Sequence, residues 1–157
     1  MPSHEDWMRL ALTLAVQAGQ AGEVPVGAVI VDAQGVCIAQ GENQRERTHD
    51  PTAHAEIVAL RQAGQVLGTW YLTDCTLYVT LEPCPMCAGA LVNARIGQLV
   101  YGAPDPKTGA IDSVLQIPTS RASNHHFPVI RGVLAAECRD VLQAWFRQRR
   151  SQGKNMP

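Results

Sequence analysis

The chain opens with apolar residues at helical spacing. Between Trp7 and Ala18 they recur every three or four positions, which is typical of a helix with one buried face. Ser3 followed by Asp6 resembles a capping box, and Gly22 is a helix-ending residue beyond the periodic stretch. The segment runs into Gly19 and Gly22, so we predict a first helix that begins near Ser3 and ends at these glycines.

Strand-like and helix-like segments then alternate along the chain. Residues 24–42 are rich in Val and Ile and surround a turn-forming segment at 32–35, which predicts a β-hairpin. Further β-branched runs predict three more strands, and two amphipathic runs predict later helices. The predicted strands are residues 75–81, 98–103 and 127–132, and the predicted later helices are residues 85–96 and 134–150.

A second helix is predicted around residues 50–64. Asp50 is a suitable N-cap, Pro51 suits the first helical position, and apolar periodicity continues to Leu60. The polar residues before it, 43–50, predict a loop. Helix two is thus expected to begin a few residues before His54.

Strands that alternate with helices of this length indicate an α/β fold. The leading hairpin adds an antiparallel pair, so we predict three α/β/α layers around a mixed five-stranded sheet. A chain of 157 residues with 46% hydrophobic content suits one compact domain over residues 1–157. No internal repeat or linker divides it.

Cysteine usage and apolar run lengths predict where the protein works. The chain has an odd number of cysteines, most of them within apolar runs: 37, 75, 84, 87 and 138. This pattern favours free thiols in a reducing cytoplasm. The apolar runs are far shorter than the roughly 18 residues of a membrane-spanning helix. We therefore expect a soluble cytoplasmic protein that does not bind a membrane.

The net charge of −1 is unevenly distributed. Residues 1–140 carry nine Lys or Arg against 14 Asp or Glu, a net charge of −5, whereas the remaining residues carry only basic charges. Arg147, Arg149, Arg150 and Lys154 make residues 135–157 a basic C-terminal helix and tail. A charged helix end is more often simply solvated, so this pattern alone predicts no partner.

The stretch EPCPMC, residues 82–87, carries the first candidate chemistry. Cys84 and Cys87 share one face of a helix start, and a helix N-terminus favours thiolate over thiol. Such a pair suits a redox site and a metal site about equally. A structural zinc site would need a second Cys-x-x-Cys or a His-x-x-x-His pair, and the sequence contains neither.

His54 and Glu56 favour a catalytic metal. His54 with two thiolates gives three protein ligands, which leaves the fourth position of a tetrahedral zinc to water, as in catalytic sites. Two helical residues differ by a rotation of about 200°, so Glu56 reaches the same site only from the first turn. There its carboxylate can move protons, which predicts a hydrolase.

HAE at residues 54–56 followed by PCPMC at 83–87 resembles the His-x-Glu…Pro-Cys-x-x-Cys signature of the zinc-dependent nucleobase deaminases. The resemblance implies that His54, Cys84 and Cys87 bind one Zn²⁺ per subunit and that Glu56 is the catalytic proton shuttle. It also implies a cytidine-deaminase-like fold over nearly the whole chain.

Three further stretches resemble the tRNA adenosine deaminases within that superfamily. They are VPVGAVIV with GENQRERTHDPTAHAE, then VYGAPDPKTGAIDSV, and NHHFPVIRGVLAAECRDVLQAWFRQRR. This resemblance implies deamination of adenosine to inosine at the wobble position of a tRNA anticodon stem-loop, by a homodimer. The substrate-binding residues that it implies are Asn43, Asp105, Lys107, Asn124, Phe146 and Arg147.

Some of these residues also have simpler interpretations. The segment 105–107 suits a plain turn, and one of Trp145 and Phe146 is expected in the core. Trp145 stands where the family usually has the first Phe of a Phe-Phe pair. The competing functions are a deaminase of free nucleobases or nucleosides such as guanine or cytosine, a Cys-x-x-Cys redox protein, and a zinc-bearing RNA-binding module without catalysis.

Overall fold

A five-stranded mixed sheet forms the centre of the computed structural model, which describes residues 2–153. Lys154 of the predicted basic tail lies outside the described residues. The strand order is β2-β1-β3-β4-β5; β1 is antiparallel to both of its neighbours, and β3, β4 and β5 are parallel. The bounds are β1 Gly27–Val31, β2 Cys37–Glu42, β3 Thr76–Leu81, β4 Gln98–Ala103 and β5 Val129–Ile130. The predicted mixed sheet is confirmed.

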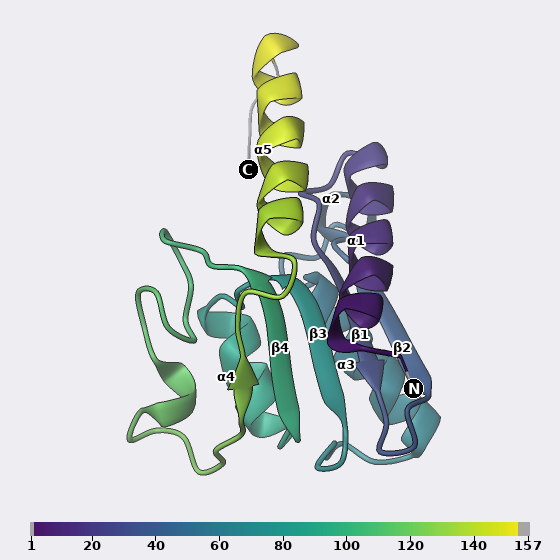
Figure 1. Cartoon of the computed structure of the whole chain (residues 1–157), viewed down its shortest axis with the longest axis vertical. Helices are drawn as coiled ribbons and strands as arrows, with labels where there is room; N and C mark the ends of the chain where they lie inside the picture. The colour runs from purple at the N-terminus through teal and green to yellow at the C-terminus, as the bar shows by residue number, and fades with distance from the viewer. Residues whose placement is uncertain (1, 154–157) are drawn as a thin grey trace.

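Helices cover both faces of this sheet (Figure 1). Helices α1 (His4–Gln20) and α5 (Ala135–Ser151) pack on one face, and α3 (Ala55–Leu67) and α4 (Pro85–Asn93) pack on the other. All five residues of β1 are buried because alternate side chains enter two separate cores. Val29 packs with α1 and α5, whereas Ile30 packs with α3 and α4. The predicted three-layer α/β/α fold is therefore confirmed.

The start of α1 follows the sequence prediction. The Ser3 hydroxyl oxygen accepts a hydrogen bond from the Asp6 N–H at 3.1 Å, and Asp6 Oδ2 accepts one from the Ser3 N–H at 2.8 Å. This is a complete capping box, which satisfies two N–H groups at the helix start.

Gly41 lets α3 lie close to β2. A Cβ atom at this position would come within 2.3 Å of the Ala55 carbonyl oxygen, which no side chain tolerates. The absence of a side chain therefore fixes where the first turn of α3 lies against the sheet. That turn carries both His54 and Glu56.

Two predictions for the segment before α3 were wrong. Residues 43–50 contain a short helix, α2 (Arg45–Thr48), and α3 begins at Ala55 with His54 as its N-cap. Asp50 does not cap a helix, because its Oδ1 accepts hydrogen bonds from the N–H and hydroxyl of Thr52 and closes a local turn.

The strand predicted at 127–132 contains only Val129–Ile130. A short 3₁₀ turn, Ile117–Thr119, lies in the loop before it.

The helices described for residues 2–153 include none with both the length and the apolar character that crossing a membrane requires.

Candidate active site

Two helix N-termini meet at the predicted metal ligands. His54 is the N-cap of α3 and Cys84 is the N-cap of α4, both with extended backbones, and Cys87 lies one turn into α4. The His54 Nδ1 atom is 3.6 Å from Cys84 Sγ and 3.5 Å from Cys87 Sγ. All three potential ligand atoms lie within 4.8 Å of one another. The structure thus brings together the three residues predicted from the sequence.

This donor set fits zinc. Typical Zn–S and Zn–N bond lengths at a tetrahedral angle separate sulfur from nitrogen by about 3.6 Å, close to the separations of 3.5 and 3.6 Å between His54 and the two sulfurs. Hydrogen bonding with Cys87 lowers the pKa of Cys84 to about 4; burial opposes this effect and the His54 ring supports it. The pair therefore supplies one thiolate at neutral pH, that of Cys84, whereas hydrogen bonding with Cys84 and burial raise the pKa of Cys87.

The same geometry separates the metal and redox interpretations. Cys84 and Cys87 are free thiols rather than a disulfide. A dithiol redox pair has no need for a histidine nitrogen in contact with both sulfurs, whereas a metal does. The position of the His54 ring thus favours a metal site.

Glu56 lies beside the cluster in the first turn of α3, where only 4% of its surface is exposed. Burial raises the pKa of its carboxyl to about 7; the neighbouring Cys84 also raises it, and His54 lowers it. A carboxyl group with a pKa near neutrality accepts and releases protons readily at physiological pH, which is what a proton shuttle needs.

A cavity of about 140 Å³ opens onto these residues. Its polar lining includes His54, Glu56 and Cys84 together with Asn43 and Asp105, two of the residues predicted to bind substrate. Its apolar lining consists of Val24, Val26 and Leu81, and Arg45, Glu82 and Thr108 complete it. The cavity therefore offers apolar walls and several polar groups beside the metal ligands, as small-molecule sites do.

Asn43 is held in place from both ends of its amide. Its Nδ2 donates to the Val24 carbonyl oxygen at 2.9 Å, and its Oδ1 accepts from the Ala55 N–H at 2.9 Å. The second bond satisfies an N–H group at the start of α3, next to His54. One hydrogen and one lone pair of the amide stay available for a bound molecule.

The other predicted substrate-binding residues do not line the cavity. Lys107 and Asn124 are exposed in loops, and Phe146 and Arg147 lie near the end of α5. The sequence left open which residue of the Trp145–Phe146 pair is in the core. The structure places Trp145 there, because it is 8% exposed and its Nε1 donates to the Gly19 carbonyl oxygen at 3.1 Å.

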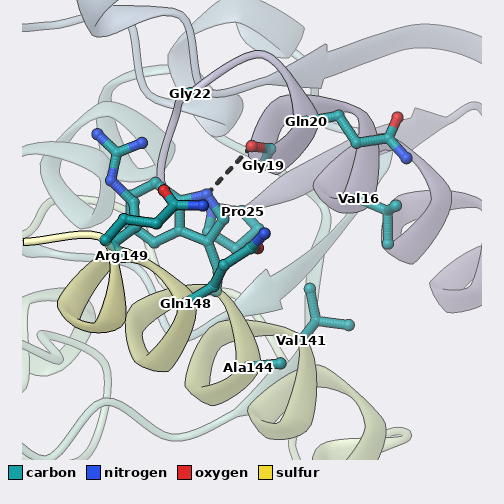
Figure 2. Close-up of a pocket in the computed structure, with 11 residues that line it drawn as sticks. Val16, Gly19, Gln20, Gly22, Pro25, Val141, Ala144, Gln148 and Arg149 are labelled. Atoms are coloured by element: carbon teal, nitrogen blue, oxygen red, sulfur yellow. Dashed lines mark hydrogen bonds between the residues drawn. The ribbon is translucent and has the colours of Figure 1, made fainter. Parts of the chain in front are cut away.

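A larger groove, of about 560 Å³, lies between the ends of α1 and α5 and includes Val16, Gly19, Val141 and Arg149 (Figure 2). It contains none of the predicted metal ligands. The Arg149 guanidinium lies 4.6 Å from the centre of the Trp145 ring, so this arginine is partly engaged in packing. The smaller cavity contains His54, Glu56 and Cys84 and is therefore the better candidate for the active site.

Glu82 is a buried carboxylate for which no role was predicted from the sequence. It is 2% exposed and precedes the cysteine motif. Its oxygens accept five hydrogen bonds, from the N–H groups of Asp105, Ile111, Asp112 and Ser113 and from the Ser113 hydroxyl. Burial would raise the pKa of this carboxyl, but the hydrogen bonds outweigh burial and lower it. Glu82 thereby fixes the loop that brings Asp105 to the cavity.

Asp105 also organises this loop. Its carboxylate accepts hydrogen bonds from the N–H of Lys107 at 3.0 Å and from the N–H and hydroxyl of Thr108 at 3.1 and 2.8 Å. The turn expected at 105–107 is therefore present, and Asp105 lies at the cavity as well.

The chain is similar to known deaminases over almost its full length. The family model of MafB19-like deaminases matches residues 2–150. A tRNA-specific adenosine deaminase of Haemophilus influenzae is 49% identical over 96% of this chain and 87% of that protein. One of Bacillus subtilis is 44% identical over 98% of this chain and 95% of that protein.

The fold of this chain is also similar to that of a solved deaminase structure. It comes from studies of A-to-I editing by tRNA:A34 deaminases at the wobble position of transfer RNA. The two structures have a TM-score of 0.84 and 44% sequence identity, over 87% of this chain and 98% of the other.

Proposed function

The chain belongs to the tRNA-specific adenosine deaminases, and we propose that it carries out their reaction with His54, Cys84 and Cys87 as zinc ligands and Glu56 as proton shuttle. It is a hydrolase that converts adenosine to inosine at the wobble position of tRNA: water supplies the oxygen at C6, and the amino group leaves as ammonia. The observation that carries the residue assignment is the convergence of three ligand atoms within 4.8 Å, beside the buried Glu56.

The residues of the site divide the chemical work. Zinc held by His54, Cys84 and Cys87 would supply a Lewis acid that activates water near neutral pH. The Glu56 carboxylate takes a proton from the attacking water, gives it to N1 of the adenine ring, and later moves a proton to the departing amino group. Its raised pKa, about 7, suits both accepting and releasing that proton.

Asn43 and the apolar wall position the base. The free hydrogen and lone pair of the Asn43 amide pair with the edge of the adenine, and Val24, Val26 and Leu81 contact its faces. A cavity of about 140 Å³ requires the base to leave its stack before it enters. Anticodon-loop bases are already unpaired, so extrusion costs less than from a duplex.

The rest of the anticodon stem-loop binds outside the cavity. Asp105 and Lys107 contact the target nucleotide or its neighbours from the loop that Glu82 holds. Asn124, Phe146 and Arg147 form the outer rim, and the basic end of α5 contacts phosphates. These assignments rest on the family resemblance and on the exposure of Lys107, Asn124 and Arg147.

A homodimer is supported by an apolar surface near α3 and α4. Val66, Leu67, Trp70 and Tyr71 are exposed by 59, 43, 64 and 50%. Trp70 borders a groove of about 600 Å³ between these two helices. Large exposed apolar patches mark interaction surfaces.

Sedimentation equilibrium should give twice the mass of a 17.0 kDa chain. Trp70→Glu should shift the measured mass toward that of one chain. A wild-type monomer at micromolar concentration would contradict the dimer.

We place the enzyme in the cytoplasm, where its free thiols would stay reduced. The whole chain, residues 1–157, would act there as a single zinc-dependent deaminase domain. Fractionation of cells that express the protein checks the location, and recovery in a membrane or secreted fraction would refute it.

The substrate assignment is tested by comparing RNA and free bases. Wild-type protein should form inosine in a tRNA with adenosine at the wobble position, and not act on the same tRNA with guanosine there, or on free adenosine, guanine or cytosine. Arg147→Gln and Arg150→Gln, singly and combined, should weaken RNA binding. The slope of log binding constant against log salt concentration should become shallower by about 0.7 to 0.9 for each lost phosphate contact. Arg149 is left intact because it packs on Trp145.

Arg9→Gln is the matched control, because Arg9 is exposed on α1 and does not line the cavity. It should leave RNA binding and its salt dependence unchanged. Efficient turnover of guanine or cytosine together with an inert tRNA would leave the zinc chemistry standing and overturn the tRNA assignment.

A further inference from the structure

The short helix α2 carries two arginines with different environments. The Arg47 guanidinium donates to Glu23 Oε2 and Glu42 Oε2, each at 3.2 Å, and to the Asn43 carbonyl oxygen at 2.6 Å. Glu23, which is 2% exposed, also accepts the N–H groups of Glu46 and Arg47. One arginine of α2 is thus used to fasten this helix to the segment between α1 and β1.

Arg45, at the first position of the same helix, is free to act on a ligand. Its side chain makes no hydrogen bond or ion pair with any residue in the described range 2–153. It is half-buried and lines the cavity together with His54, Glu56 and Asp105. It is the one Lys or Arg among the described lining residues.

Two of the carboxylates that line the cavity, Glu82 and Asp105, already have other hydrogen-bond donors. Glu82 is satisfied by five donors, and Asp105 accepts three hydrogen bonds from its own loop. Arg45 is not among the residues with a buried, unpartnered side-chain nitrogen in the described range, so its guanidinium reaches solvent and its five N–H donors are open to a ligand. A substrate with an anionic group at the cavity mouth would pair with this guanidinium.

We propose that Arg45 binds a phosphate group that flanks the target adenosine, an inference that rests on the function proposed above. A base inside the cavity leaves its ribose and flanking phosphates at the opening, within reach of a long side chain that lines the cavity, as Arg45 does. Guanidinium groups pair with phosphate through two parallel hydrogen bonds, which lysine does not reproduce. Glu23 anchors α2 and so holds the backbone of Arg45 in position before the RNA binds.

This contact separates adenosine in RNA from free adenosine. A free nucleoside fills the cavity with the same base but has no phosphate for Arg45. Arg45 is therefore a specificity-determining residue, and its contribution is expected in substrate binding more than in the chemical step.

The test combines enzyme variants with RNAs that carry one neutral linkage. Short anticodon stem-loop RNAs are made with a methylphosphonate on the 5′ or the 3′ side of the target adenosine, and kcat and KM for inosine formation are measured. With unmodified RNA, Arg45→Gln should lower kcat/KM roughly 10- to 100-fold, mainly through KM, as expected for a lost charged hydrogen bond. Arg45→Lys should fall between the two, and Arg9→Gln should match wild type.

The neutral linkage identifies the partner atom group. A methylphosphonate on one side of the target adenosine should lower kcat/KM of the wild-type enzyme by about the same factor as Arg45→Gln does. The same RNA should lower kcat/KM of Arg45→Gln little further. The proposal is overturned if neither methylphosphonate weakens wild type, if both proteins lose the same factor, or if Arg45→Gln is as active as wild type. Zinc content and thermal midpoint of Arg45→Gln should equal those of wild type, since Arg45 makes no side-chain bond within residues 2–153.

Failure of the underlying function has a different result. If wild type does not deaminate the unmodified stem-loop or a full tRNA, the tRNA assignment fails before Arg45 is tested. If wild type is active and only the Arg45 comparison fails, the tRNA assignment stands and the phosphate contact is refuted.

Discussion

Glu56→Gln should lower kcat by at least about 10² to 10⁴ while zinc content and RNA affinity stay within a few-fold of wild type. The side chain keeps its shape and its place in the first turn of α3, but it no longer accepts a proton. Because the proposed mechanism uses this one carboxylate for both the attack of water and the departure of ammonia, the loss should lie at the upper end of that range. Single-turnover inosine formation at saturating enzyme measures the chemical step, and metal analysis measures zinc.

Glu46→Gln is the matched control for this substitution. Glu46 is exposed, and its carboxylate forms no ion pair with any residue in the range 2–153. It should keep wild-type turnover. Near-normal turnover by Glu56→Gln would refute the proton-shuttle role, and loss of zinc from that variant would mean that Glu56 is a ligand instead.

Removal of a metal ligand should greatly weaken zinc binding and abolish activity. Purified wild type is expected to contain about one zinc per chain, and His54→Ala, Cys84→Ala or Cys87→Ala should each lose most of it. With two donors left, the apparent zinc affinity should fall at least roughly 100-fold, more than the 10- to 100-fold loss on changing a residue that only supports a ligand. Competition with a chromogenic chelator measures the affinity.

Cys75→Ala provides the comparison for the cysteine variants. Cys75 is a free, buried cysteine, as Cys87 is, but it does not belong to the cluster of ligand atoms. It should retain one zinc per chain. A His54→Ala variant with full zinc would contradict the ligand assignment, and a wild-type protein with a reversible Cys84–Cys87 disulfide and little zinc would favour the redox alternative.

The sequence predicted those features that depend on short-range patterns. Helical spacing and the Ser3–Asp6 box located α1, and the Val-rich segments located the strands of the mixed sheet. The candidate metal ligands were also recognisable, because His54 and the two cysteines combine residue type with position at helix starts.

The errors lie where a distant residue decides between two local structures. Asp50 followed by Pro51 suits a helix start as well as a turn, and the sequence alone does not distinguish them. The N–H of Ala55, the first residue of α3, is instead satisfied by Asn43, which lies 12 positions upstream. In the same way, nothing near Glu82 in the sequence shows that its partners come from residues 105–113.

The Glu82 network determines which positions of its loop should tolerate substitution. Four of its five donors are main-chain N–H groups, so the contacts with Glu82 depend little on the side chains of residues 105–113, although the Asp105 carboxylate separately holds residues 107 and 108. Gly109 is an exception, because a Cβ atom there would lie 2.4 Å from Glu82 Cδ. Pro106 and Lys107 are exposed and their side chains give Glu82 no hydrogen bond, so we expect substitutions there to leave the loop backbone and the neighbouring His54, Cys84 and Cys87 cluster in place.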